Sequence, residues 1–252
     1  MNIKQIRNAT LIIGYASKKF LIDPVFADKG TYQPFPNPLR QDENNPLVDL
    51  PVTIKELINV DAVIVTHTHL DHIDDVAKER LPKDIKIFVQ DKHDYNEMRE
   101  CEFNNIEILS ENTQFHNIKL IKTLGQHGRG KILEFAGNVC GVIFKNDNEK
   151  TLYLAGDTVW YEEVEKTLSI HRPEVIIING GDNQFFDSGS LIMGKNDIYE
   201  VHKCLPNSKL LITHMEAMNH WTLSRKELRE FTKEKGFSNK VLIPKDGENY
   251  EL

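Results

Sequence analysis

Short apolar runs, mostly β-branched and separated by polar turns, open the chain. Residues 10–14 and 20–23 flank the polar residues 17–19, and this alternation predicts a β-hairpin. Residues 62–65 are apolar without a break, as in a strand that is buried on both faces. Residues 24–51 contain six prolines and little periodicity. That segment is too long for a plain connector, and the sequence leaves open whether it covers a site or is a solvated excursion without function.

From residue 62 onward, predicted strands and helices alternate. A strand-rich block covers residues 106–154, with turns at glycines and at the polar residues 146–148. The other predicted elements are strands at 85–89, 175–178 and 210–213, and helices that begin at the cap Asp91, after Thr158, before Ile198 and at a capping box in residues 224–227. No repeat, low-complexity tract or linker interrupts this order. We therefore expect residues 1–252 to form a single α/β domain with sheets inside and helices outside.

The densest chemistry follows the buried strand, in residues 66–72, Thr-His-Thr-His-Leu-Asp-His. His67 and His69 are two residues apart in an extended stretch, so they point to the same side and fit one metal ion. Asp71 and His72 lie beyond them, where a turn aims them at a second metal. The alternative is a polar loop that is rich in histidine by chance, but this density at a strand end is rare. The pattern predicts a two-metal site.

Three further candidates lie at or just past predicted strand ends. His127 lies among the glycines of residues 125–130, which let the backbone approach an ion closely. Asp157 follows the strand that ends near residue 154, and His214 follows the strand at 210–213. Each is weak evidence alone, because a single strand-end His or Asp is more often a cap or a turn residue.

Taken in order, these residues resemble the signature of the metallo-β-lactamase superfamily. All seven ligand positions match: the HxHxDH motif at His67, His69, Asp71 and His72, then a His, a Gly-Asp-Thr aspartate and a final His at His127, Asp157 and His214. The resemblance implies a four-layer αββα sandwich with the site at one edge of the two sheets. It also implies that one metal takes His67, His69 and His127, that the other takes Asp71, His72 and His214, and that Asp157 bridges them.

Departures from particular branches of the superfamily narrow the expected activity. Secreted β-lactamases place Cys where this chain has Asp157, flavodiiron proteins place Glu where it has His69, and the long nucleases add an arm or a second domain. The chain looks most like the small bacterial metal-dependent hydrolases that include the ascorbate-phosphate lactonase and phospholipase D-like members. That resemblance implies a dinuclear hydrolase in which a metal-bridging hydroxide cleaves a small anionic ester, lactone or phosphodiester. A metal-dependent nuclease and a non-catalytic metal-binding regulatory protein of the same fold are the alternatives.

Some of the candidate residues have expected roles in catalysis or substrate binding. Asp71 is expected to orient the attacking water, and His220 to donate a proton to the leaving group. Substrate contacts are expected from Arg129, Asn219 and Asp182, with surface and turn residues as the competing interpretation. Two divalent ions are expected, zinc first, with manganese or iron as alternatives. Their charge exceeds that of the two ligand carboxylates and a hydroxide, so the site would attract an anionic substrate.

Composition adds limits on partners and compartment. The 252 residues include 31 Lys plus Arg and 38 Asp plus Glu, a net charge of −7 that argues against a nucleic-acid surface. The three Cys lie far apart and indicate neither a thiolate zinc site nor a disulfide framework. No signal peptide or membrane-length apolar run is apparent. We expect a cytoplasmic protein with a small-molecule substrate, no nucleic acid and no membrane span, and the sequence leaves homo-oligomerisation open.

Overall fold

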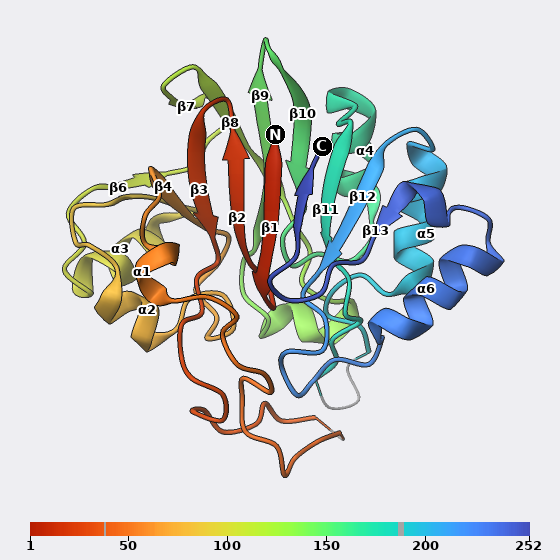
Figure 1. Cartoon of the computed structure of the whole chain (residues 1–252), viewed down its shortest axis with the longest axis horizontal. Helices are drawn as coiled ribbons and strands as arrows, with labels where there is room; N and C mark the ends of the chain where they lie inside the picture. The colour runs from red at the N-terminus through yellow and green to blue at the C-terminus, as the bar shows by residue number, and fades with distance from the viewer. Residues whose placement is uncertain (38, 186–188) are drawn as a thin grey trace.

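The computed structural model describes residues 1–37, 39–185 and 189–252. Within these residues, two seven-stranded mixed sheets face each other (Figure 1). The first has the order β14-β1-β2-β3-β4-β5-β6. Its strands are β1 (Asn2–Arg7), β2 (Thr10–Tyr15), β3 (Lys18–Ile22), β4 (Ala62–Val65), β5 (Lys86–Val89), β6 (Ile106–Ile108) and β14 (Asn249–Glu251).

The second sheet has the order β13-β12-β11-β10-β9-β8-β7. Its strands are β7 (Thr113–Phe115), β8 (Ile118–Leu124), β9 (Cys140–Asn146), β10 (Glu149–Leu154), β11 (Val175–Asn179), β12 (Lys209–Thr213) and β13 (Val241–Leu242). Strands β7 to β10 pair antiparallel, whereas β10 to β13 pair parallel. Parallel strands buried on both faces explain the unbroken apolar runs in β4 and β11.

Helices cover the outer face of each sheet, three against each (Figure 1). Their bounds are α1 (Ile54–Leu57), α2 (Asp75–Arg80), α3 (Lys92–Glu100), α4 (Glu162–His171), α5 (Lys195–Cys204) and α6 (Arg225–Glu234), with 3-10 turns at Gly130–Glu134 and Ser238–Lys240. The predicted caps are confirmed: Asp91 accepts from the backbone of His93 and Asp94, and Ser224 forms the capping box with Glu227. None of these helices has the length and apolar character to span a bilayer.

Three apolar layers separate the four layers of secondary structure. The central layer lies between the sheets and includes Phe20 and Phe144, whose rings meet edge to face with centroids 5.2 Å apart. A second layer joins α4 to α6 to one sheet, and a third joins α1 to α3 to the other. Burial of each such aliphatic or aromatic side chain contributes about 1.5–3 kcal/mol. The expected αββα sandwich is therefore confirmed.

The N-terminal strand β1 is an element that the sequence pattern did not predict. Its two apolar residues, Ile3 and Ile6, are separated by Lys4 and Gln5, so it lacks the period of two of a strand, yet it pairs with both β2 and the C-terminal strand β14. Arg7 is fully buried because its guanidinium donates to the carbonyls of Val25, Ala27 and Val48. Those bonds anchor the long proline-rich segment between β3 and α1.

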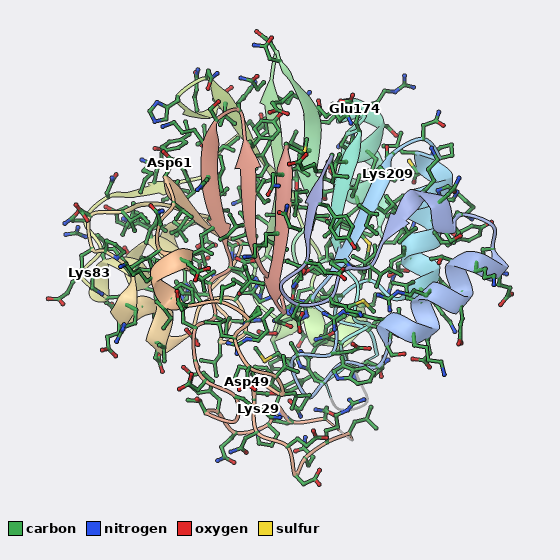
Figure 2. All side chains as sticks on the ribbon, in the orientation of Figure 1. Lys29, Asp49, Asp61, Lys83, Glu174 and Lys209 are labelled. Atoms are coloured by element: carbon green, nitrogen blue, oxygen red, sulfur yellow. The ribbon has the colours of Figure 1, made fainter. Side chains whose placement is uncertain are left out.

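That segment extends from the edge of the sandwich to which the arrowheads of β3 and β10 point (Figure 1). Figure 2 labels two residues of this segment, Lys29 and Asp49, and both are exposed. Its backbone also pairs internally, between Tyr32 and Asn45. The segment is therefore folded against the sandwich at one edge.

Candidate metal centre

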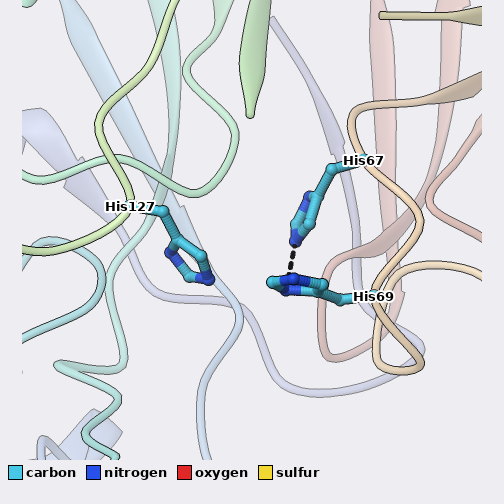
Figure 3. Close-up of side chains that lie close together, drawn as sticks. All are labelled: His67, His69 and His127. Atoms are coloured by element: carbon cyan, nitrogen blue, oxygen red, sulfur yellow. Dashed lines mark hydrogen bonds between the residues drawn. The ribbon is translucent and has the colours of Figure 1, made fainter. Parts of the chain in front are cut away.

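Two of the motif histidines converge with a third from the opposite sheet. His67 and His69 follow β4, and His127 follows β8. Nε2 of His67 lies 3.0 Å from Nδ1 of His69, and Figure 3 shows the ring of His127 approaching from the other side. One nitrogen from each of the three rings lies within 4.8 Å of the others. Nδ1 of His127 lies 3.1 Å from the Leu191 carbonyl, so a hydrogen bond there leaves Nε2 free to face the cluster.

The remaining motif residues form a second group with the last strand-end histidine. Asp71, His72 and His214 each offer one ligand atom within 4.8 Å of the others, and all three side chains are buried. Nε2 of His214 lies 3.2 Å from Nε2 of His72 and 3.2 Å from Oδ2 of Asp71. Two imidazole nitrogens this close, next to a carboxylate, fit a shared cation, and nitrogen with oxygen donors suits zinc and its neighbours.

Asp157 lies between the two groups. Its Oδ2 is 3.3 Å from Nε2 of His72 and 3.8 Å from Nε2 of His127, and its Oδ1 is 3.8 Å from Nε2 of His214. Asn179, the last residue of β11, donates to the same Oδ1 at 2.6 Å and fixes the carboxylate. The carboxylate thus faces donors of both groups.

Gly156 explains how Asp157 reaches this position. Its φ is +68°, and an added Cβ would lie 2.3 Å from the Cys140 carbonyl oxygen. Only glycine avoids both the left-handed strain and this backbone collision. The Gly-Asp-Thr turn therefore brings the carboxylate close to the neighbouring strand.

Asp23 supports the cluster, and the sequence analysis gave it no role. Its buried carboxylate accepts from Thr66 N at 2.7 Å and Thr66 Oγ1 at 2.8 Å, and it pairs with Nδ1 of His72 at 2.9 Å. Because Nδ1 of His72 contacts Asp23, Nε2 of the same ring faces Asp157. The available signal was its position directly after β3, which matches the strand-end placement of the other site residues.

Asn8 and Asn183 also hold the cluster; the sequence pattern gives no signal for Asn8, whereas Asn183 lies in the polar turn with Asp182 that follows a predicted strand. Asn8, in the β1–β2 turn, donates to the Asp71 carbonyl, and its own carbonyl accepts from His214 N. The side-chain amide of Asn183 lies 3.2 Å from Nδ1 of His214 and 3.0 Å from Nε2 of His220. Turns distant in the sequence thus hold His214 from two sides.

The clustered charges shift the pKa values of the site residues. Burial alone would raise the pKa of Asp157, but the imidazoles of His72 and His214 hold it well below its usual value. Burial would lower the pKa of His72, yet Asp157 and Asp23 raise it well above its usual value. Burial lowers the pKa of His67 and His127, which keeps these rings neutral and able to bind a metal at neutral pH.

His220 lies beside the second group. Its Nε2 is 3.8 Å from Oδ2 of Asp71, and its ring packs against Phe35 with centroids 4.9 Å apart. Burial lowers the pKa of His220 to about 4. The expected role of His220 as proton donor stays a prediction, and a ring that is neutral at pH 7 does not favour it.

A cavity of about 270 Å³ opens onto the cluster. Its polar floor comprises His69, Asp71, His127, Asp157 and His220. Its walls are apolar and come from loops of both sheets, including Phe35, Ile132 and Phe135. Ligand sites commonly combine such a wall with a few converging polar groups.

The three residues expected to contact substrate lie outside the lining of this cavity. Arg129 forms an ion pair with Asp197 and donates to the Trp160 carbonyl. Asp182 accepts from Ser190. Asn219 is fully buried and bonds to the long segment described above. Their substrate roles stay predictions, and these contacts do not favour them.

The αββα sandwich with a His and Asp cluster at one edge defines the class of metallo-β-lactamase-fold proteins. The family model of the beta-lactamase superfamily domain matches residues 18–215. The chain belongs to this superfamily.

Individual relatives match over nearly the whole chain. UPF0173 protein YddR of Bacillus subtilis is 59% identical over 99% of both chains. A UPF0173 metal-dependent hydrolase of Pelotomaculum thermopropionicum is 28% identical over 94% of this chain and 93% of its own. The crystal structure of isothiocyanate hydrolase from Delia radicum gut bacteria superposes with a TM-score of 0.96 at 42% identity, covering 100% of this chain and 99% of that one.

Proposed function

We propose that this protein is a dinuclear metal-dependent hydrolase whose centre is the cluster at the sandwich edge. The observation that carries the proposal is the convergence of two three-residue groups on either side of Asp157. We assign His67, His69 and His127 to one divalent cation, Asp71, His72 and His214 to the other, and Asp157 to both. The nitrogen and oxygen donors suit zinc first, and manganese or iron as alternatives.

Bound divalent cations supply Lewis acidity and lower the pKa of water. The residues of the chain orient the reactants. Asp71 lines the cavity and its pKa is held well below the usual value by His214 despite burial, so its carboxylate stays ionised and orients the attacking water. His220 lines the cavity and is neutral at pH 7, so its uncharged ring contacts the substrate without adding charge beside Asp71.

An organic isothiocyanate is the first substrate to test. The basis is the solved isothiocyanate hydrolase, which is 42% identical and matches over the whole chain. In this reaction, water adds to the carbon of the N=C=S group, and the bond between that carbon and the nitrogen then breaks. Both hydrogens of the water end on nitrogen, so the products are an amine and carbonyl sulfide, and no oxidant or reductant is needed.

Small anionic esters, lactones and phosphodiesters are the second candidate class. Two divalent cations contribute a charge of about +4 and the carboxylates of Asp71 and Asp157 about −2, which leaves a positive centre. That charge attracts an anion, although the cavity walls offer it no cation among the described residues. The same positive centre would attract the phosphates of RNA, the substrate of a nuclease, so RNA belongs in the same panel.

The test is a hydrolysis assay on protein reconstituted separately with zinc, manganese and iron. Benzyl and allyl isothiocyanate, a phosphodiester, a lactone and an RNA are the substrates, and released amine or acid is measured. We expect amine release by the wild type and a loss of at least 100-fold in His67→Ala. The matched control is His116→Asn, an exposed histidine of the β7–β8 turn at the opposite end of β8 from His127.

Two outcomes would overturn the proposal. One is less than about one equivalent of bound metal after reconstitution, because the chemistry requires a metal. The other is metal binding that His67→Ala abolishes while no substrate distinguishes the variant from the wild type. That second result would favour a non-catalytic metal-binding protein.

A further inference from the structure

The walls of the cavity differ from its floor in chemistry. Above the polar floor, the described lining consists of Phe35, Leu70, Ile132, Phe135, Ala136, Phe185 and Leu191, with no Lys or Arg. Phe135, one of these residues, is 79% exposed, and such high exposure is unusual for so large an apolar side chain. Such walls bind an uncharged hydrocarbon group, since they offer an anion no counter-charge.

Phe35 is the wall residue that packs on His220 of the cavity floor. Its ring packs edge-on against His220, with the ring planes at 77°. It belongs to the long segment between β3 and α1, whose two ends are held by Arg7 and, at Phe26 and Ala27, also by Asp74. A residue on so long a segment needs local bonds to hold one position.

Asn219 supplies those bonds. Its Oδ1 accepts from Phe35 N at 2.9 Å, and its Nδ2 donates to the Phe35 carbonyl at 3.0 Å. Asn45, farther along the segment, bonds to both the backbone and the side chain of Asn219, at 2.8 and 2.9 Å. A fully buried amide thus ties two points of the segment to the residue next to His220.

Arg40 adds a third attachment at the same place. Its guanidinium donates to the carbonyls of Asn219 at 3.0 Å and Trp221 at 2.8 Å. It also lies 3.6 Å from the centroid of the Trp221 ring. The segment is therefore preorganised over the cavity rather than free to close over it.

We propose that Phe35 determines specificity by forming one wall of a subsite for an uncharged hydrocarbon group of the substrate, and that Asn219 is its positioning residue. This inference rests on the proposed function, because the hydrocarbon group must sit above the metal centre. It assigns Asn219 a role different from the direct substrate contact that the sequence suggested. The subsite selects electrophilic substrates that carry an uncharged aromatic or branched aliphatic group.

The experiment compares benzyl, methyl and 4-carboxyphenyl isothiocyanate as substrates of the reconstituted protein. We expect the wild type to prefer benzyl. Phe35→Ala raises KM for benzyl about tenfold, the equivalent of one lost aromatic contact, and leaves KM for methyl nearly unchanged. Asn219→Ala shows the same selective rise in KM. In Asn219→Asp, which keeps the acceptor for Phe35 N, the rise is smaller. Metal content stays at the wild-type value in all three variants.

Leu39→Ala is the matched control. Leu39 lies on the same segment, is 40% exposed and does not line the cavity, so its removal leaves the ratio of benzyl to methyl unchanged. Equal KM ratios in the wild type, Phe35→Ala and Asn219→Ala would overturn the inference while the proposed function stands. An equal rise in KM for every substrate would also overturn it, because that result indicates general disruption.

Calorimetric binding of benzyl alcohol separates this inference from the proposed function, because that ligand carries the hydrocarbon group and no isothiocyanate. Binding to the wild type that weakens in Phe35→Ala supports the subsite even where no isothiocyanate is hydrolysed, in which case only the proposed function fails. Identical binding to both proteins contradicts the subsite.

Discussion

Replacing Asp23 by Asn tests whether a residue outside the ligand set controls metal affinity. The buried carboxylate takes three contacts, from Thr66 N, Thr66 Oγ1 and Nδ1 of His72. The amide of Asn keeps an acceptor for one backbone donor, but it cannot provide a charged acceptor for His72 as well. The side-chain volume is unchanged, so packing stays close to that of the wild type.

The expected size of the effect follows from the contact that is lost. A buried hydrogen bond to a charged group contributes about 1.5–3 kcal/mol. Loss of a carboxylate that orients a metal-binding histidine reduces metal affinity about 10- to 100-fold, or about 1.4–2.7 kcal/mol. We therefore expect Asp23→Asn to bind zinc about 10- to 100-fold more weakly, measured by competition with a chromophoric chelator at pH 7.

Asp74→Asn is the matched control for this experiment. Asp74 is also fully buried, and it accepts from the backbone of Phe26, Ala27 and Ala77 without touching a histidine of the cluster. Urea unfolding of the metal-free proteins should show a comparable loss of stability in both variants. Wild-type zinc affinity in Asp23→Asn, with a loss confined to stability, would refute the reasoning that Asp23 orients His72.

Three further measurements probe the turn, the buried histidine and the metals. Gly156→Ala should lower the free energy of unfolding in urea by more than about 2 kcal/mol, because its Cβ meets the Cys140 carbonyl oxygen. Gly130→Ala, with a similar φ of +69° and open space, should lower it by only about 1 kcal/mol. Equal losses would argue against the collision. His220 has a pKa of about 4 when folded and about 6.5 when unfolded, so the unfolded state binds more protons between these values and stability falls as pH decreases. From pH 7 to pH 5, the metal-free wild type should lose about 2 kcal/mol more unfolding free energy than His220→Asn, and parallel pH profiles would disprove this. Chelation should lower the thermal midpoint and abolish hydrolysis, with zinc or manganese restoring both; full activity after chelation would exclude the metal mechanism.

The sequence predicted most of the sandwich because its strands and helices carry strong local patterns. The hairpin of β2 and β3, the buried strand β4 and the helix caps all appear where the pattern placed them. Strand β1 was missed because its two isoleucines are three residues apart among polar residues, which lacks the period of two of a strand. Its tertiary partners β2 and β14 satisfy the backbone of that strand, and the carbonyls of Val25, Ala27 and Val48 in the long segment hold the buried Arg7.

For the site, the sequence by itself determined the identity and order of seven metal-capable residues. Their spacing at strand ends follows from local structure, so it could be read before any fold was known. Only the tertiary structure decided that Asp157 faces both groups and that Asp23, Asn8 and Asn183 hold the rings. It also decided that Asn219 ties Phe35 to the cavity wall and that Arg129 pairs with Asp197. These contacts join residues far apart in the chain, and no local periodicity records which distant loops will meet.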